Sequence, residues 1–235
     1  MVLLLNPTLE RPGLVKTFAA STAVLILGIA ALWSATDGGQ AFTTETFRRQ
    51  QVARQPQRIA PFNVTLADGN PTRLDTVLAS GGKVWLIDFV YTRCQTVCSS
   101  LGSIYQQLQT QIEARGLQGK VGLLSISFDP ANDTALALAA YAKRMQMSPT
   151  VWQVVTLTDW QDRRRLLDAF GIMVVPAPLG EFEHNAALHV VSSSSVLHHI
   201  IDYTDFGNAL DVAARMAGDA NLSNTVVSAA AARAP

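Results

Sequence analysis

The residues from Val84 to Tyr91, VWLIDFVY, form an almost unbroken apolar run. A strand of this composition is typical of a sheet that is buried on both faces, in which helical crossovers join parallel neighbours. A second apolar run, Val121 to Phe128, follows a segment whose apolar residues have helical spacing: Leu101, Ile104, Tyr105, Leu108 and Ile112. The sequence therefore predicts an α/β fold in which helices flank a central sheet.

Further elements on both sides of these strands complete the predicted domain. The stretch PFNVTLADGNPTRL indicates short strands or a hairpin around its central Asp-Gly. Asp133 stands where an N-cap would begin a helix from about 134 to 145, and a later helix, from about 159 to 170, ends at Gly171. The runs AALHVV and VLHHII predict an antiparallel hairpin, and helical spacing returns from Phe206 to Met216. The predicted sheet is therefore mixed.

No residue between Thr17 and Thr36 is charged, and the stretch is rich in Ala, Leu, Ile and Val. About 20 such residues form a helix that crosses a bilayer. A cleaved signal peptide has a shorter apolar region, of about 7–15 residues, and the polar segment that follows argues against a helix of a soluble core. We expect five parts: a short N-terminal cytoplasmic segment (1–16), a transmembrane anchor (17–36), a linker (37–57), the folded domain (58–217) and a disordered tail (218–235).

Charge and cysteine content exclude several classes of protein. Lys plus Arg and Asp plus Glu both number 18, so the formal net charge is zero. A nucleic-acid-binding domain carries a basic excess, so we expect no nucleic-acid partner. The chain has only two cysteines, which rules out a multi-bridge disulfide scaffold and a zinc site built from four cysteines of one chain.

Cys94 and Cys98 stand directly after the first apolar strand, at the start of the helix that follows. Residues four apart at a helix start share a face, so both sulfurs come within range of one disulfide or one metal ion. A helix N-terminus favours negative charge, which stabilises at least one thiolate. A purely structural disulfide is the alternative, but so short a loop hardly constrains the unfolded chain. The pair therefore indicates metal or redox chemistry.

A metal ion held by two thiolates needs a third ligand, and the chain has four histidines. His184 lies in a predicted loop, 176–185, directly before a strand, where a mobile segment could deliver an imidazole. His189 lies within a predicted strand, a position more typical of packing, whereas His198 and His199 point to opposite faces of a late strand near the sheet edge. Two sulfurs and one nitrogen form a soft set that suits three-coordinate Cu(I) better than structural zinc.

Three segments, in this order, resemble the motifs of the Sco/SenC family of copper chaperones for cytochrome c oxidase: FVYTRCQTVCSSL, SFDPANDT and EFEHNAALHVV. The resemblance spans about Ala60 to Tyr203, and the order of elements is that of a thioredoxin-like domain. It implies that Cys94, Cys98 and His184 bind Cu(I). It also implies copper delivery, or thiol reduction, at the CuA centre of oxidase subunit II.

The same resemblance implies a location and partners. The domain would face the periplasm, or the mitochondrial intermembrane space in a eukaryote, on a single span of the inner membrane. The implied partners are subunit II or another extracytoplasmic cuproprotein, and other copper chaperones or thiol reductases. Gln95 and Ser99 stand where the family often has proline, and Glu183 where aspartate is usual, which suggests a divergent branch.

Asp88 interrupts the central apolar strand, where a lone buried carboxylate is costly. The stretch WLIDFVYTRC resembles thioredoxin, in which a buried aspartate at the same distance before the first active-site cysteine assists proton transfer. The resemblance implies that Asp88 could serve Cys94 or Cys98 in this way. It supports an alternative function, a thiol–disulfide reductase acting on extracytoplasmic cysteine pairs. A structural hydrogen bond or ion pair is the other interpretation of Asp88.

Asp129 and Asp133 follow the second apolar strand. Asp129 with the proline after it fits the start of a turn, and Asp133 fits a helix cap. From the family's motif alone, both carboxylates are candidates for a role beside the metal ligands or in partner docking.

Overall fold

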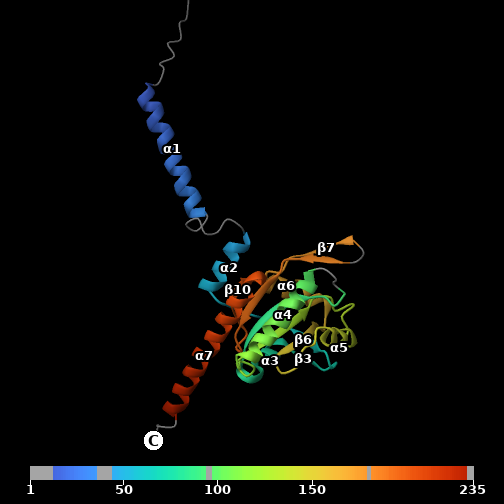
Figure 1. Ribbon diagram of the computed structural model, residues 1–235. Helices are drawn as coiled ribbons and strands as arrows, with labels where there is room; N and C mark the ends of the chain where they lie inside the picture. Colours follow the sequence, from blue (N-terminus) through green and yellow to red (C-terminus); the bar gives the residue numbers. More distant parts are fainter. Residues whose placement is uncertain (1–12, 36–43, 94–96, 179–180, 232–235) are drawn as a thin grey trace, which may run out of the picture. The chain divides into compact units, whose positions relative to one another are not determined.

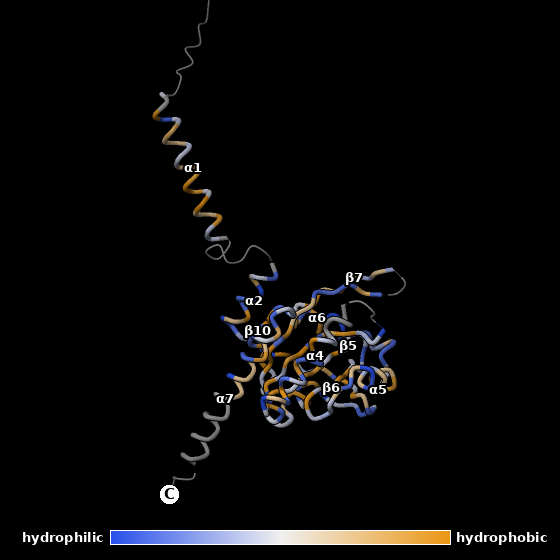
Figure 2. Tube along the Cα trace, in the orientation of Figure 1, coloured by the Kyte–Doolittle hydropathy of each residue, from blue (hydrophilic) through white to orange (hydrophobic). Residues whose placement is uncertain are grey.

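The computed structural model describes residues 13–35, 44–93, 97–178 and 181–231, and of residues 14, 35, 44, 97–101 and 219–231 it describes the backbone only. The chain divides into two compact units, Met1–Gln50 and Gln51–Pro235. The first unit contains α1 (Leu14–Ala35), whose stretch from Val15 to Ser34 is long and apolar enough to cross a membrane. Apolar residues recur along α1 (Figure 2). Helix α2 (Thr44–Arg54) follows in the predicted linker.

The second unit is built on an eight-stranded sheet (Figure 1) with the strand order β1-β10-β9-β4-β5-β6-β2-β3. Its strands are β1 (Gln57–Arg58), β2 (Asn63–Leu66), β3 (Pro71–Arg73), β4 (Val84–Val90), β5 (Val121–Ser127), β6 (Trp152–Leu157), β9 (Ala187–Val191) and β10 (Val196–Asp202). The central strands β4, β5 and β6 are parallel, and the outer pairs are antiparallel. The mixed sheet is confirmed, although the sequence did not indicate β6.

Helices cover both faces of this sheet. Successive side chains of β4 point to opposite faces, so this strand packs against helices on each side. Leu86 packs with residues of α4 (Val97–Ala114) and α7 (Phe206–Ala231), and Val90 packs with α5 (Ala135–Arg144). Trp85 and Ile87 pack on the other face with α3 (Leu74–Ala79) and α6 (Arg163–Phe170). Three 3₁₀ turns also lie among the described residues of this unit: η1 (Ser80–Gly82), η2 (Trp160–Asp162) and η4 (Tyr203–Asp205). The continuous apolar runs thus mark strands buried on both faces.

Helix ends agree with the sequence in one case and differ in two. Gly171 ends α6 in the left-handed region, with φ 64°, as predicted. The N-cap of α5 is Thr134, whose side chain accepts the Ala137 N–H, so the prediction that Asp133 caps this helix was wrong. The sequence predicted a disordered tail from residue 218, whereas the backbone of α7 is helical to Ala231. Alanine has the highest helix propensity, which accounts for this difference.

A separate two-stranded sheet stands beside the main one. It consists of β7 (Val174–Pro176) and β8 (Phe182–His184), paired in antiparallel register with Val174 opposite His184. In Figure 1 this hairpin extends from the domain beside α6. The sequence predicted that His184 lies in a loop; instead it is the last residue of β8. The hairpin connects α6 to β9 and therefore positions this histidine.

Candidate metal centre and its supports

The two cysteines follow the carboxyl end of β4, a central parallel strand. Cys94 lies outside the described residues, and Cys98 lies in the first turn of α4, where the structure describes the backbone. Crevices at the carboxyl ends of parallel strands are the usual ligand sites of open α/β sheets. Among the described side chains, which include neither cysteine, no three His, Cys, Asp or Glu residues gather as metal ligands would. A metal centre here therefore depends on the cysteines.

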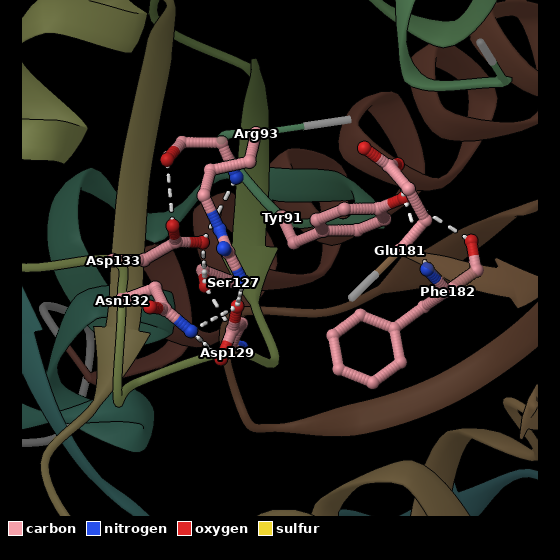
Figure 3. Close-up of polar contacts among 9 residues, drawn as sticks. Tyr91, Arg93, Ser127, Asp129, Asn132, Asp133, Glu181 and Phe182 are labelled. Carbon is pink, nitrogen blue, oxygen red and sulfur yellow. Dashed lines mark hydrogen bonds and ion pairs between the residues drawn. The ribbon is translucent and has the colours of Figure 1, made fainter. Parts of the chain in front are cut away.

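Asp133 fixes the segment that leads from β4 toward Cys94 (Figure 3). Its carboxylate accepts the Thr92 N–H at 2.9 Å, the Thr92 hydroxyl at 2.6 Å and the Ser127 hydroxyl at 2.5 Å. The Thr92 carbonyl accepts a further bond from Arg144 at 3.0 Å. Burial raises the pKa of Asp133, and the hydrogen bonds from Ser127 and Thr92 partly offset this. Asp133 thus supports the approach to the cysteines and does not cap a helix.

Asp129 supports the next residue of the same segment. Its buried carboxylate accepts a bond from the Arg93 guanidinium at 3.1 Å, and the Asn132 amide donates to both of its oxygens, at 3.0 and 2.9 Å. Figure 3 shows Arg93 lying over Asp129 and Asn132. Asp129 and Asp133 therefore hold two consecutive residues, Thr92 and Arg93, that directly precede Cys94.

Tyr91 joins this segment to the hairpin. Its hydroxyl donates to the Glu181 carboxylate at 2.5 Å and accepts the backbone N–H of Phe182 at 3.2 Å. Its ring also packs edge-on against the ring of Phe182, with centroids 5.4 Å apart. Figure 3 shows Glu181 and Phe182 on one side of Tyr91. Because Tyr91 is three residues before Cys94 and Phe182 is two before His184, one side chain links the segment that leads to Cys94 with the strand that ends in His184.

His184 is half-buried and packs on the same aromatic cluster. Its ring lies 5.3 Å from the ring of Phe128, which also contacts Phe182 at 5.8 Å. Its Nδ1 lies 3.1 Å from the backbone oxygen of Asn185. In the tautomer that donates this bond, Nε2 carries the lone pair that a metal ion needs. The imidazole is thus oriented as metal-ligating histidines commonly are.

Arg163, the first residue of α6, packs against this cluster from outside. Its guanidinium lies 4.6 Å from the Trp160 ring, 4.8 Å from Phe182 and 5.5 Å from Phe128. Its Nε is buried and has no hydrogen-bond partner among the described residues. Burial lowers the pKa of the Arg163 guanidinium, and the charge of Asp129 partly offsets this. Stacking of this kind is worth up to about 2 kcal/mol when the cation is desolvated.

Asp88 is fully buried on the α4 face of the sheet, opposite Ser125 of β5. Neither of its oxygens has a hydrogen-bond partner among the described residues by distance and angle. Burial raises the pKa of Asp88 to about 7, although the nearby hydroxyls of Ser125 and Tyr105 lower it in part. Tyr105 lies seven residues after Cys98, so the two positions share a face of α4 about 10 Å apart along the axis. The carboxyl thus lies on the side of the sheet where Cys98 begins the helix.

The other three histidines lie away from this cluster. His189 is buried in β9 between Phe89 and Phe170, with its ring nitrogens 3.3 and 3.0 Å from backbone oxygens of Ile87 and Phe170. This is the predicted packing role. His198 and His199 are half-buried, and β10 is not simply an edge strand, because β1 pairs with its first two residues. Burial lowers the pKa of both.

The sequence analysis missed five residues that support the predicted site: Tyr91, Phe128, Arg144, Arg163 and Glu181. Tyr91 carried a usable signal, because a hydroxyl at the end of a buried apolar strand needs a hydrogen-bond partner. The others are brought in by tertiary packing, which local sequence patterns do not encode.

Comparison with known proteins places the chain in one protein family. The sequence model described as SCO1/SenC matches residues 50–218. The SCO1 protein homolog of Bacillus subtilis (strain 168) is 31% identical over 98 residues, which are 42% of this chain and 48% of that protein. The match thus spans about half the length of this relative.

Solved structures share the fold. A SCO1/SenC family lipoprotein from Bacillus anthracis str. Ames superposes with a TM-score of 0.58 and 24% identity, covering 68% of this chain and 98% of that one. Arabidopsis thaliana ScoI with copper bound gives 0.56 and 18%, covering 67% and 98%. BsSco, a member of the Sco family of cytochrome c oxidase assembly proteins with a disulfide switch, gives 0.55 and 24%, covering 68% and 94%. At these identities the likeness shows the fold, and it confirms the predicted thioredoxin-like sheet.

Proposed function

This chain belongs to the SCO1/SenC family, and from that premise we propose that it is a membrane-anchored copper chaperone that delivers Cu(I) to the CuA site of cytochrome c oxidase subunit II. Copper is bound in the solved Arabidopsis thaliana ScoI, and BsSco belongs to a family of oxidase assembly proteins. Copper is the cargo in this proposal, so it must be held tightly and still be released.

The proposed ligands are Cys94, Cys98 and His184. Two thiolates and one imidazole suit Cu(I), which accepts three ligands, whereas structural zinc takes four. Asp129 and Asp133 are proposed to act beside the metal ion without touching it, because their carboxylates are already engaged by the Thr92–Arg93 segment. A site assembled from a strand end and a separate hairpin lets one ligand withdraw during transfer.

The link through Tyr91 is the observation that carries this proposal. The residues before Cys94 and those before His184 are far apart in sequence, yet Tyr91 binds both Glu181 and Phe182 of the hairpin. A structural disulfide between Cys94 and Cys98 would need no histidine nearby. The described contacts therefore favour a three-ligand site over a purely structural pair.

The proposed location follows from α1. We assign residues 17–36 as the anchor, 37–57 as the linker, 58–217 as the copper-binding domain and 218–235 as a tail without an assigned role. The domain is proposed to face the periplasm, or the intermembrane space in a eukaryote, where it meets subunit II. Other copper chaperones or thiol reductases would load and reduce it, since Cu(I) binding requires both thiols to be free.

X-ray absorption of the full chain, loaded with Cu(I) in detergent, tests the ligand set. We expect two sulfur ligands and one imidazole nitrogen per copper, and loss of the imidazole signal in His184→Ala. Retention of the imidazole signal in His184→Ala would contradict the assignment of His184, and a four-sulfur or oxygen-rich shell would contradict the whole set.

Asp88 favours a second candidate function, thiol–disulfide reduction by Cys94 and Cys98. A buried carboxyl with a pKa of about 7 exchanges protons in the range where thiols react. The pH profile of disulfide reduction by the full chain distinguishes a catalytic from a structural Asp88. Under this alternative, Asp88→Asn removes the inflection near pH 7; an unchanged profile would leave Asp88 without a role in proton transfer.

A further inference from the structure

Exposed apolar side chains gather beside the hairpin. In the part of the domain whose side chains are described, four large hydrophobic residues are exposed. Three of them lie close together along the chain: Trp160 in η2 at 49%, Met173 just before β7 at 68% and Val175 in β7 at 58%. Trp160 and Met173 line a groove of about 520 Å³, whose floor includes the buried Leu167 and Ile172. Clustered exposed apolar surface of this kind marks a site of interaction with another molecule.

The residues that line the same groove carry a net positive charge, because Arg163 and Arg164 stand beside one carboxylate, Asp168. Arg163 lines it, and no described carboxylate lies within ion-pair distance of its guanidinium. Arg164 also lines it and meets Asp168 only at 3.7 Å, with both side chains largely exposed. The interaction energy of such an exposed ion pair is small, so Asp168 holds Arg164 only weakly. The groove thus offers two guanidinium groups beside apolar side chains and is suited to a carboxylate flanked by an apolar residue.

The groove adjoins the proposed copper site. Val174 lines it and pairs across the hairpin with His184. Arg163 also lines the groove, and its guanidinium lies 4.8 Å from the ring of Phe182, two residues before that histidine. A segment bound in the groove would therefore lie next to the strand that delivers the imidazole ligand.

We propose that the groove between α6 and β7 is where the copper recipient docks, recognising a segment in which a carboxylate stands beside an apolar side chain. This inference rests on the proposed function, because it assigns the partner of the same site. The charged rim would steer the encounter, and Trp160 and Met173 would supply the apolar contact. Docking there would place the recipient's own copper ligands beside His184.

A binding measurement tests the inference. The copper-free, reduced full chain in nanodiscs is titrated with the soluble CuA domain of the organism's own subunit II. Arg164→Glu and Met173→Ser alter the groove without touching the proposed ligands. Lys120→Glu is the matched control, because this exposed lysine directly precedes β5, at the end of the sheet away from the cysteines. We expect Arg164→Glu to weaken binding about tenfold at low salt and much less near 1 M salt, where charges are screened. Met173→Ser should weaken binding at both salt concentrations.

Cu(I) titration of the same proteins separates the two proposals. Docking in the groove is supported if the wild type binds the CuA domain, both groove variants weaken this binding and Lys120→Glu leaves it unchanged. This holds whether or not the chain binds copper. Equal binding by wild type and both groove variants overturns it, as does no binding of the wild type. Self-association of the chain through the groove, without recipient binding, would also overturn it. Failure of the wild type to bind Cu(I) overturns the proposed function alone.

Discussion

The hydroxyl of Tyr91 donates a hydrogen bond of 2.5 Å to the carboxylate of Glu181, although 90 residues separate the two in the sequence. The same hydroxyl accepts the N–H of Phe182 in β8. Tyr91 therefore fixes the hairpin that ends in His184 to the strand that leads to Cys94. This contact joins two motifs that are distant in the sequence.

Replacing Tyr91 by phenylalanine should loosen the hairpin while keeping the aromatic packing. The change removes a hydrogen bond to a charged group, and we expect the free energy of unfolding to fall by about 1–3 kcal/mol. Hydrogen exchange of the Phe182 amide is the direct measurement, because this N–H loses its acceptor. Tyr203→Phe, in a half-buried tyrosine of η4, is the control and should change stability by less than about 0.5 kcal/mol. Undiminished protection of the Phe182 amide in Tyr91→Phe would contradict the link.

Removing the carboxylate of Asp133 should release the segment before Cys94. Asp133→Ala leaves the Thr92 N–H and two hydroxyls without their acceptor, so we expect a loss of about 2–3 kcal/mol in unfolding free energy. Thermal or denaturant unfolding gives this value. Asp168→Ala, which removes only an exposed and long ion pair, should cost less than about 1 kcal/mol. Equal losses in the two variants would show that Asp133 is not a structural support.

Asp88 should make stability depend on pH. Its pKa is about 7 in the folded chain against 3.8 for an ordinary aspartate, so the folded state binds the proton more tightly. Stability is therefore highest at low pH and falls as the pH rises from about 4 to about 7. Relative to Asp88→Asn, the wild type should lose about 4 kcal/mol of unfolding free energy between about pH 4 and pH 8. A pH-independent difference between the two proteins would show that folding does not raise the pKa of Asp88.

The sequence was informative where burial dictates composition. The runs beginning at Val84 and Val121 are apolar because β4 and β5 are covered on both faces, so their pattern predicted central strands. Gly171 was predictable because its left-handed conformation disfavours other residues. The β6 strand, Trp152–Leu157, was missed because a short apolar run carries little information without its neighbours.

The supports of the site were harder to predict. The sequence marked Asp129 and Asp133 as notable but assigned Asp133 to a helix cap, since aspartate before a helix usually has that role. Its partners are Thr92, just after β4, and Ser127, the last residue of β5, and only the assembled sheet brings them together. The role of Arg163 could not be predicted for the same reason, because its three aromatic neighbours come from separate parts of the chain.

An anaerobic competition titration of the reduced full chain against a Cu(I) chelator measures whether Cys94, Cys98 and His184 together hold one Cu(I). Wild type, Cys94→Ser, Cys98→Ser and His184→Ala are compared, with His198→Ala as the control from a histidine outside the cluster. We expect tight binding of one Cu(I), abolished by either serine substitution, weakened by His184→Ala and unaffected by His198→Ala. No appreciable Cu(I) binding by the reduced wild type, or equal binding by the wild type and the cysteine variants, would contradict a copper site at these residues.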